Sequence, residues 1–201
     1  MTMPAPSFYF PAPRTQKFCS QCGSSLIQRI PADDSRLRDV CDNCGAIHYQ
    51  NPRNVVGVLP VLGDKVLLCR RAIHPRYDKW TLPAGFMELG ETTAQGAERE
   101  TQEEAGAQIE LGPLYTVIDV PYANQVHFFF LAKVLSTELN PGPESLEAGF
   151  FFKVGNPLGR SGLPHRQHHA RALFPRPAQR PVSRSLLRHS LAGRPLAVDG
   201  P

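Results

Sequence analysis

The sequence lacks any long apolar run. No stretch of its 201 residues approaches the roughly 20 consecutive apolar residues that a membrane-spanning helix needs, so we expect no membrane association. The first residues, MTMPAPSFYFPAPRTQ, are rich in proline and do not have the basic region followed by an apolar stretch that marks a signal peptide. We therefore expect a cytoplasmic protein. A hydrophobic content of 41% is sufficient for a globular core, and the length fits one ordinary domain with a small appendage.

Acidic residues are almost absent from the last quarter of the chain. Residues 154–201 contain eight arginines and one acid, Asp199, whereas residues 1–153 carry 14 basic and 17 acidic side chains. The net charge of +4 is therefore a property of the tail, and we expect no specific nucleic-acid binding by the rest of the chain. Two explanations stay open for this atypical basic tail. It is either a disordered extension that binds an anionic surface, or the product of a reading-frame shift near codon 149. The abrupt onset of the arginine, proline and histidine bias favours the frame shift.

Cysteine is scarce, but four of the five cysteines occur in two CxxC pairs. CSQC holds Cys19 and Cys22, CDNC holds Cys41 and Cys44, and 18 residues separate the pairs. This spacing is typical of a zinc ribbon with four thiolate ligands. Nothing else suggests secretion, which disfavours disulfides, and a redox CxxC would not need two copies. Four protein ligands leave no open position for chemistry, so we predict a structural zinc ion.

Residues 85–107, GFMELGETTAQGAERETQEEAGA, gather six glutamates around a single arginine. Thr92 and Gln95 have the spacing of a capping box, and Gly106 stands where a helix end favours a left-handed residue. The sequence therefore predicts a helix from about Thr93 to Ala105. Residues three and four apart share a helix face, so the last three glutamates of the segment repel one another on one stripe. A hard divalent cation such as Mg²⁺ or Mn²⁺ would remove that repulsion. A solvated acidic face is the alternative.

The fixed positions of this segment resemble the Nudix box without a gap. They are Gly85, Glu91, Arg99, Glu100, Glu103, Glu104 and Gly106. The resemblance implies hydrolysis of a nucleoside diphosphate linked to another moiety, by attack of water on phosphorus.

The resemblance also assigns roles to these residues. Glu100, Glu103 and Glu104 correspond to the ligands of a catalytic Mg²⁺ or Mn²⁺. Arg99 corresponds to the arginine that orients a catalytic carboxylate, with Glu91 as its expected partner. The general base is left open between Glu100 and an acid from a later loop, such as Glu147. Gly85 corresponds to the glycine that lets the loop between strand and helix move.

Other segments narrow the resemblance. HYQNPRNVVG, CRRAIHPRYDKWTLPAGFMELGE and PGPESLE resemble zinc-ribbon Nudix hydrolases related to FAD and ADP-ribose pyrophosphatases, over about residues 17–150. This similarity implies cleavage of ADP-ribose or FAD to AMP plus ribose 5-phosphate or FMN. NADH pyrophosphatases also carry a zinc ribbon, but the segment after the box lacks their substrate motif rich in Ser, Gln, Pro, Trp and Phe. NADH is therefore an alternative substrate, and a catalytically silent nucleotide-binding module is a second alternative. The resemblance also allows a homodimer, which the sequence does not show.

Four further residues are candidates for the site. Glu144 and Glu147 are placed in a loop after the last clear strand, where either could assist the metal or serve as the base; a solvated loop acid is the alternative. Trp80, just before the box, is a candidate for substrate binding, although an isolated tryptophan is more often a core residue. Arg70, beside Arg71, is a candidate for binding substrate phosphates, although basic strand ends are common.

The order of motifs predicts an α/β fold preceded by a small zinc ribbon. NVVGVLPVL and KVLLCRR form one predicted hairpin around Gly63-Asp64, and LYTVIDVPY and QVHFFFLAKVL form another after the helix. The resemblance implies a Nudix αβα sandwich with a mixed sheet and a second helix near the C-terminus, which the sequence does not reveal. The predicted domains are a disordered N-terminus (1–16), the zinc ribbon (17–50), the Nudix hydrolase domain (51–153) and the basic tail (154–201).

Overall fold

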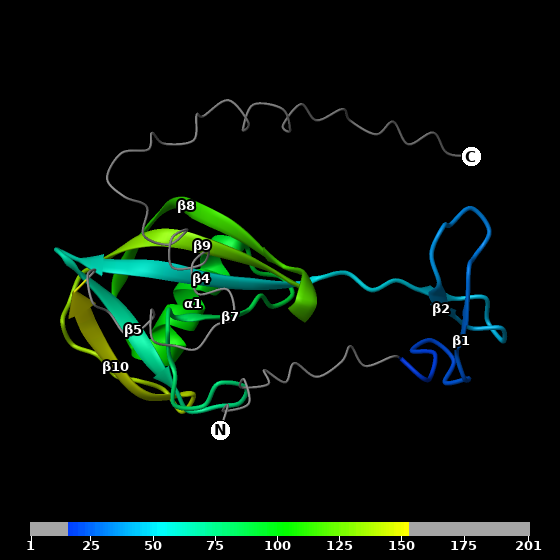
Figure 1. The fold of residues 1–201 in the computed structure, drawn as a ribbon, viewed down its shortest axis with the longest axis horizontal. Helices are drawn as coiled ribbons and strands as arrows, with labels where there is room; N and C mark the ends of the chain where they lie inside the picture. The colour runs from blue at the N-terminus through cyan, green and yellow to red at the C-terminus, as the bar shows by residue number, and fades with distance from the viewer. Residues whose placement is uncertain (1–15, 153–201) are drawn as a thin grey trace, which may run out of the picture.

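The computed structural model describes residues 16–152, which form a small sheet and a larger α/β domain. The small sheet contains β1 (Ile27–Arg29), β2 (Arg38–Val40) and β3 (Ile47–His48), antiparallel and in that order. In Figure 1 it lies apart from the larger domain, joined by the extended segment that leads into β4. The zinc-ribbon residues and the helix that carries the glutamates thus belong to separate parts of the molecule.

The larger domain is built on a mixed sheet of seven strands in the order β10-β5-β4-β9-β8, with β6 paired to β5 and β7 to β4. Its strands are β4 (Arg53–Leu62), β5 (Lys65–Arg71), β6 (Trp80–Thr81), β7 (Ala84–Phe86), β8 (Ile109–Val120), β9 (Gln125–Val134) and β10 (Ser145–Phe152). β4 and β9 run parallel, and the other pairs are antiparallel. A 3-10 turn, η1 (Pro121–Ala123), joins β8 to β9. The predicted α/β class with a mixed sheet is confirmed, as are both predicted hairpins.

The helix α1 (Thr93–Ala105) lies on one face of this sheet (Figure 1) and has the predicted bounds. The Thr92 side chain accepts a hydrogen bond from the Gln95 backbone N–H, and the Gln95 side chain accepts one from the Thr92 N–H. Gly106 ends the helix in the left-handed conformation, with φ of 61°. A loop far along the chain covers the same end, because Asn140 donates its backbone N–H to the Ala105 carbonyl. Local capping signals therefore fix where the glutamates begin and end.

The core lies on both faces of the sheet. On the face under α1, small helix residues pack against strand side chains, and Ala97, Thr101 and Ala105 are fully buried. The opposite face carries a separate cluster built on Leu68 and Phe129. Short side chains on the helix let its backbone approach the sheet closely, which brings the glutamates of the same helix near the strand ends.

One predicted loop is wrong. The segment after β9 contains a strand, β10, and Glu147 lies in that strand instead of a loop. β10 pairs with β5 as far as Phe152 opposite Lys65, so the sheet continues past Gly149, where the sequence character was expected to change. The N-terminus, the tail and the second helix of the predicted sandwich lie outside the described residues.

Within residues 16–152, no helix combines the length and the apolar character that crossing a membrane requires.

Gly57 provides a test of the close packing between β4 and β7. A Cβ atom at this position would overlap the Ala84 side chain, the Pro83 carbonyl and the Phe129 ring. Overpacking of this kind typically costs about 1–3 kcal/mol. We predict that Gly57→Ala lowers the free energy of unfolding by about that amount in urea titrations. Gly149→Ala is the control, because a Cβ there meets only ordinary contacts with Phe151 and Trp80. Equal stability of the two variants would contradict the packing.

Candidate active site and cysteine cluster

Arg99 on α1 joins the carboxylates of the predicted box. Its Nε and one terminal nitrogen donate to both oxygens of Glu91, at 3.0 and 2.9 Å. The other terminal nitrogen donates to Glu100 at 2.9 Å and to Glu103 at 3.0 Å. A further bond of 3.1 Å reaches the Phe86 carbonyl at the end of β7. The structure thus contains the predicted Arg99–Glu91 pair and adds two more carboxylates to the same guanidinium.

This arrangement sets the charge states of the group. The hydrogen bonds from Arg99, and then the Glu88 backbone N–H, lower the pKa of Glu91 to about 2. The pKa of Arg99 is raised, chiefly by its bonds to Glu91. Burial raises the pKa of Glu100, and Arg99 opposes that shift. Glu91 and Arg99 therefore form an ion pair at neutral pH. The same guanidinium also hydrogen-bonds the Glu100 carboxylate.

Glu104 is the most deeply buried carboxylate of the set. Its residue is 5% exposed, and its Oε2 accepts a hydrogen bond of 2.9 Å from the Ala84 backbone N–H. Burial raises its pKa to about 7; the Ala84 bond and the charge of Arg71 oppose the rise, and Glu100 and Glu144 add to it. A further cation near Glu104, in addition to Arg71, would favour the ionised form of its carboxyl group.

The three predicted metal ligands suit a hard divalent cation by their chemistry. All are carboxylates, the donor type that Mg²⁺ and Mn²⁺ prefer. One oxygen of each, Oε2 of Glu100 and Oε1 of Glu103 and Glu104, takes no hydrogen bond or ion pair from residues 16–152. Burial raises the pKa values of Glu100 and Glu104, so a cation bound beside them would favour their ionised forms. The donor chemistry of these three residues therefore suits such an ion, but among residues 16–152 only the four cysteines already bring their ligand atoms together as a metal-holding group, so the role of the glutamates as ligands stays a prediction.

Gly85 in β7 lies directly beneath Glu100. A Cβ at this position would overlap the Glu100 carboxylate, so any side chain would displace it. The glycine predicted as a hinge thus has a packing reason to be there. Gly106, the last fixed glycine, is similarly crowded, since a Cβ there would overlap Asn140.

Of the two candidate loop acids, the structure brings Glu144 to the carboxylates. Glu144 raises the pKa values of both Glu100 and Glu104, so its charge lies within electrostatic reach of them. Its carbonyl accepts a hydrogen bond from the Ala72 N–H at 2.8 Å, which anchors it beside the end of β5. Glu147 instead forms an ion pair of 3.1 Å with Arg70.

The structure does not bring Arg70 and Trp80 to the carboxylates. Arg70 forms ion pairs with Asp78 and Glu147, which neutralise its charge. Trp80 packs edge-on against Phe151, with ring centroids 4.6 Å apart, in the cluster on the sheet face opposite α1. Their predicted role in substrate binding stays a prediction that this geometry does not support.

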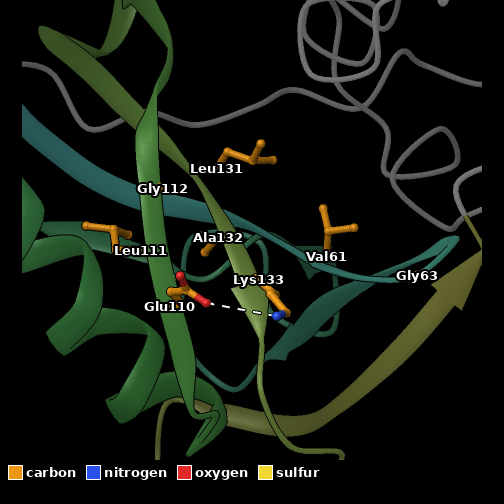
Figure 2. Close-up of a pocket in the computed structure, with 8 residues that line it drawn as sticks. All are labelled: Val61, Gly63, Glu110, Leu111, Gly112, Leu131, Ala132 and Lys133. Carbon is orange, nitrogen blue, oxygen red and sulfur yellow. Dashed lines mark ion pairs between the residues drawn. The ribbon is translucent and has the colours of Figure 1, made fainter.

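A largely apolar hollow elsewhere in the domain contains none of the predicted residues. Figure 2 shows it beside β4, β8 and β9, with the ion pair between Lys133 and Glu110, 4.0 Å long, at its edge. It is lined by Val61, Gly63, Glu110, Leu111, Gly112, Leu131, Ala132 and Lys133. Its lining has one acid and one base, already paired with each other, and so offers little for chemistry on a phosphate.

The four cysteines of the CxxC pairs converge at one point. Their sulfur atoms all lie within 4.8 Å of one another, with 3.6 Å between Cys19 and Cys44 and 3.4 Å between Cys22 and Cys41. Four sulfurs at about 2.3 Å from a central zinc ion would lie about 3.8 Å apart in a tetrahedron. The cluster therefore fits the predicted zinc ion. Among residues 16–152 it is the group of His, Cys, Asp or Glu side chains whose ligand atoms lie close enough together to hold a metal ion.

Neighbouring groups support the thiolates. Gly23 and Gly45 follow the second cysteine of each pair with φ of 76° and 75°, and each donates its N–H to the carbonyl of the first cysteine at 2.8 Å. Two neighbours of the cluster were not predicted from the sequence: His48, whose Nε2 lies 3.4 Å from the Cys19 sulfur, and Asn43, whose side-chain amide donates to the Cys22 sulfur at 3.6 Å. No spacing in the sequence marks His48 or Asn43 as a neighbour of the cysteines. His48 reaches the cluster because β3 pairs with β2.

Family models match both parts of the chain. A zinc-ribbon model described as Nudix N-terminal matches residues 17–50, and the NUDIX domain model matches residues 51–173. The chain is similar to NAD-capped RNA hydrolases NudC. That of Photobacterium profundum is 33% identical over 142 residues, which is 70% of this chain and 51% of the relative. The NAD-capped RNA hydrolase NudC of Pseudomonas aeruginosa is 29% identical over 188 residues, which is 92% of this chain and 59% of the relative. The chain thus spans about half the length of the curated relatives it matches.

Solved structures agree on the fold. A NUDIX hydrolase from Nitrosomonas europaea is 52% identical, with a TM-score of 0.69, over 71% of this chain and 81% of that one. An ADP-ribose pyrophosphatase from Streptococcus suis matches with a TM-score of 0.52 at 23% identity, over 61% of this chain and 90% of that one. The second likeness concerns the fold alone.

The cysteine cluster generates a prediction on metal content. We predict one zinc ion per chain by mass spectrometry of the purified protein, and its loss in Cys41→Ser. Because zinc-thiolate binding supplies roughly 10 kcal/mol of folding free energy in small zinc domains, the amide signals of residues 17–50 should collapse in the variant. Cys69→Ser is the control, since this buried thiol lies in β5, away from the cluster. Full zinc content in Cys41→Ser would refute the site.

Glu104 generates a prediction on pH. Its folded pKa, about 7, lies above the usual value of 4.5, so the folded state holds the proton more tightly. Stability therefore falls as the pH rises from about 4.5 to about 7, by on the order of 3 kcal/mol for this group. We predict that Glu104→Gln, measured without added divalent metal, is more stable relative to wild type at pH 8 than at pH 5.

The single tryptophan, Trp80, reports on the larger domain, so its fluorescence in urea titrations measures the effect. Glu98→Gln on the exposed side of α1 is the control for a change of charge. An equal difference between wild type and Glu104→Gln at the two pH values would show that Glu104 titrates normally.

Proposed function

This chain belongs to the NUDIX domain family, and we propose that it hydrolyses the pyrophosphate bond of a nucleoside diphosphate linked to another moiety. The observation that carries the proposal is the carboxylate group around Arg99. Glu91, Glu100 and Glu103 share one guanidinium, and the buried Glu104 lies one turn along the same helix. A solvated acidic face would leave all four side chains exposed, whereas here only Glu103 is exposed and Glu91, Glu100 and Glu104 are largely covered.

In this proposal Glu100, Glu103 and Glu104 hold one or more Mg²⁺ or Mn²⁺ ions. Such ions, when bound, neutralise charge on the pyrophosphate and activate water. The chain's own contribution is positioning. Arg99 fixes Glu100 through the Glu91 ion pair, and the Ala84 N–H fixes one oxygen of Glu104. Zinc in the cysteine cluster has a structural role.

For the general base we propose Glu144, with Glu100 as the other candidate. A base must lie within reach of the water that attacks the substrate, which in this proposal is held at the carboxylates of α1. Glu147, the other candidate acid of this segment, is paired with Arg70, whose side chain does not reach these carboxylates. Glu144 interacts electrostatically with both Glu100 and Glu104, and the Gly142 N–H bond to the Glu103 carbonyl, 3.1 Å long, holds its loop against α1.

The proposed substrates share an ADP half. ADP-ribose and FAD are the ones that the sequence resemblance favours, with AMP as the common product. A second candidate is an NAD-type substrate, because the curated relatives are named NAD-capped RNA hydrolases. NADH and NAD-capped RNA therefore belong in the same test. A small nucleotide is the proposed partner, and a homodimer is compatible with it.

A catalytically silent nucleotide-binding module is the alternative from another class. The intact set of carboxylates around Arg99 supports an enzyme over this alternative. A silent module would bind nucleotide without releasing AMP.

Chromatographic product analysis tests the proposal. We predict that the chain, with Mg²⁺ or Mn²⁺, releases AMP from at least one of ADP-ribose, FAD and NADH. Glu104→Gln should lower kcat by at least about 100-fold, because one carboxylate of the catalytic group is lost. Glu98→Gln, the same change on the exposed side of the same helix, should keep the wild-type rate. Comparing the rates of cleavage of a 5′-NAD-capped oligonucleotide and of free NAD shows whether the chain prefers an RNA substrate or a small nucleotide. Turnover that survives in Glu104→Gln would sink the assigned site, and folded, zinc-loaded protein without turnover would favour the silent module.

A further inference from the structure

His48 lies in β3, where the register of the small sheet fixes the direction of its side chain. β3 pairs with β2 so that His48 stands opposite Asp39, and Asp39 stands opposite Gln28 of β1. Because side chains alternate along a strand, this polar row lies on one face of the sheet, and the next row, centred on Val40, lies on the other. From this fixed position His48 points to the side of the sheet where Cys19 lies.

Hydrogen bonds to a buried carboxylate hold the polar row together. Asp39 is 6% exposed, and its two carboxylate oxygens accept from the side-chain amides of Gln28 at 3.4 Å and of Gln50 at 3.1 Å. A buried carboxylate is costly unless it is hydrogen-bonded, so the Gln50 bond ties the chain just after β3 to β2. The position of His48 is therefore fixed by the backbone pairing of β3 and by the Gln50 bond two residues later.

The imidazole of His48 contacts the cysteine cluster from outside. Its Nε2 atom lies 3.4 Å from the Cys19 sulfur, within hydrogen-bonding distance of a sulfur acceptor. Among residues 16–152, the side chains whose ligand atoms all lie within 4.8 Å of one another are the four cysteines, and His48 is outside that group. It therefore does not add a fifth ligand. A thiolate that binds zinc can only accept a hydrogen bond, so the tautomer that fits this contact carries its proton on Nε2.

Burial makes this contact important for Cys19. The residue is 3% exposed, so water contributes little to solvating the charge of its thiolate. The Gln21 backbone N–H lies 3.4 Å from the same sulfur, on the side of the first knuckle. Cys22 differs, because it is exposed and its bond from Asn43 is exposed too, so water can replace that donor. Four thiolates carry more negative charge than one zinc ion neutralises, and a donor that reaches the buried thiolate offsets part of the excess.

We propose that His48 is a positioning residue of the zinc site. Its Nε2–H donates a hydrogen bond to the Cys19 thiolate, which orients this ligand and raises the affinity of the cluster for zinc. Partners that contact a ligand without touching the metal contribute roughly 10- to 100-fold in metal affinity. The inference concerns metal retention by the ribbon and does not depend on which substrate the larger domain hydrolyses.

Competition titration against a chromophoric zinc chelator tests the assignment on the full chain. We predict that His48→Leu lowers the affinity for zinc by roughly 10-fold or more, because the buried thiolate loses a donor that water cannot replace. His48→Gln should recover most of the affinity, because its amide can place an N–H near the position of Nε2. Tyr49→Phe is the matched control and should bind zinc like wild type, since it removes only the hydroxyl of an exposed neighbouring side chain. Equal affinities of His48→Leu and wild type, or equally weak binding by His48→Leu and His48→Gln, would overturn the proposal.

Substitution of zinc by Co²⁺ gives a second readout, which a purely structural role of His48 would leave unchanged. The thiolate-to-cobalt absorption of wild type should be that of four thiolates. In His48→Leu it should move to longer wavelength, because a thiolate that loses a hydrogen bond gives up an electron more readily. An unmoved band, a wild-type spectrum of three thiolates and one imidazole, or no metal binding by wild type would each count against the proposal.

A measurement on the wild-type chain keeps the proposal testable if His48→Leu does not fold. With an NMR-active cadmium isotope in the cluster, the Nε2 proton of His48 should show a scalar coupling to the metal, transmitted through the hydrogen bond to the Cys19 sulfur. A His48 ring that carries no proton on Nε2, or an Nε2 proton without this coupling, would refute the assignment.

Discussion

The carboxylate site depends on one guanidinium. Arg99 donates to Glu91 from the loop before α1, to Glu100 and Glu103 on α1 and to the Phe86 carbonyl at the end of β7. Three consecutive segments of chain therefore converge on one rigid, permanently charged group. Without it, three carboxylates would repel one another at the edge of the sheet. With it, Glu91 stays ionised far below neutral pH, and Glu100 is held where it is half-buried.

Much of this arrangement could be predicted because its signals are local. The capping box at Thr92 and the left-handed Gly106 gave the bounds of α1, and the spacing of the CxxC pairs gave the cysteine cluster. Hydrogen bonds and metal ligands a few residues apart leave a pattern in the sequence. A spacing of eight residues does not by itself require a contact between Glu91 and Arg99. This pair was expected only from the resemblance to the Nudix box.

The features that were missed depend on pairing between distant segments. β10 is a strand because it lies against β5, some 80 residues earlier, and the segment between Ser145 and Phe152 has no alternation of buried and exposed residues that would have revealed it. Glu147 was therefore placed in a loop, and its ion pair with Arg70 could not be foreseen.

Close packing between α1 and the sheet links stability to the proposed chemistry. Small residues at Ala97, Thr101 and Gly85 let the helix lie near the strands, and the same approach buries Glu104 and Glu100. Burial raises the pKa values of both groups, so ionising them costs folding free energy in the absence of a cation. The same cost increases the benefit of binding a divalent ion, because its charge then acts on poorly solvated carboxylates. A helix held further from the sheet by larger side chains would carry better-solvated glutamates, and these would gain less from binding a metal.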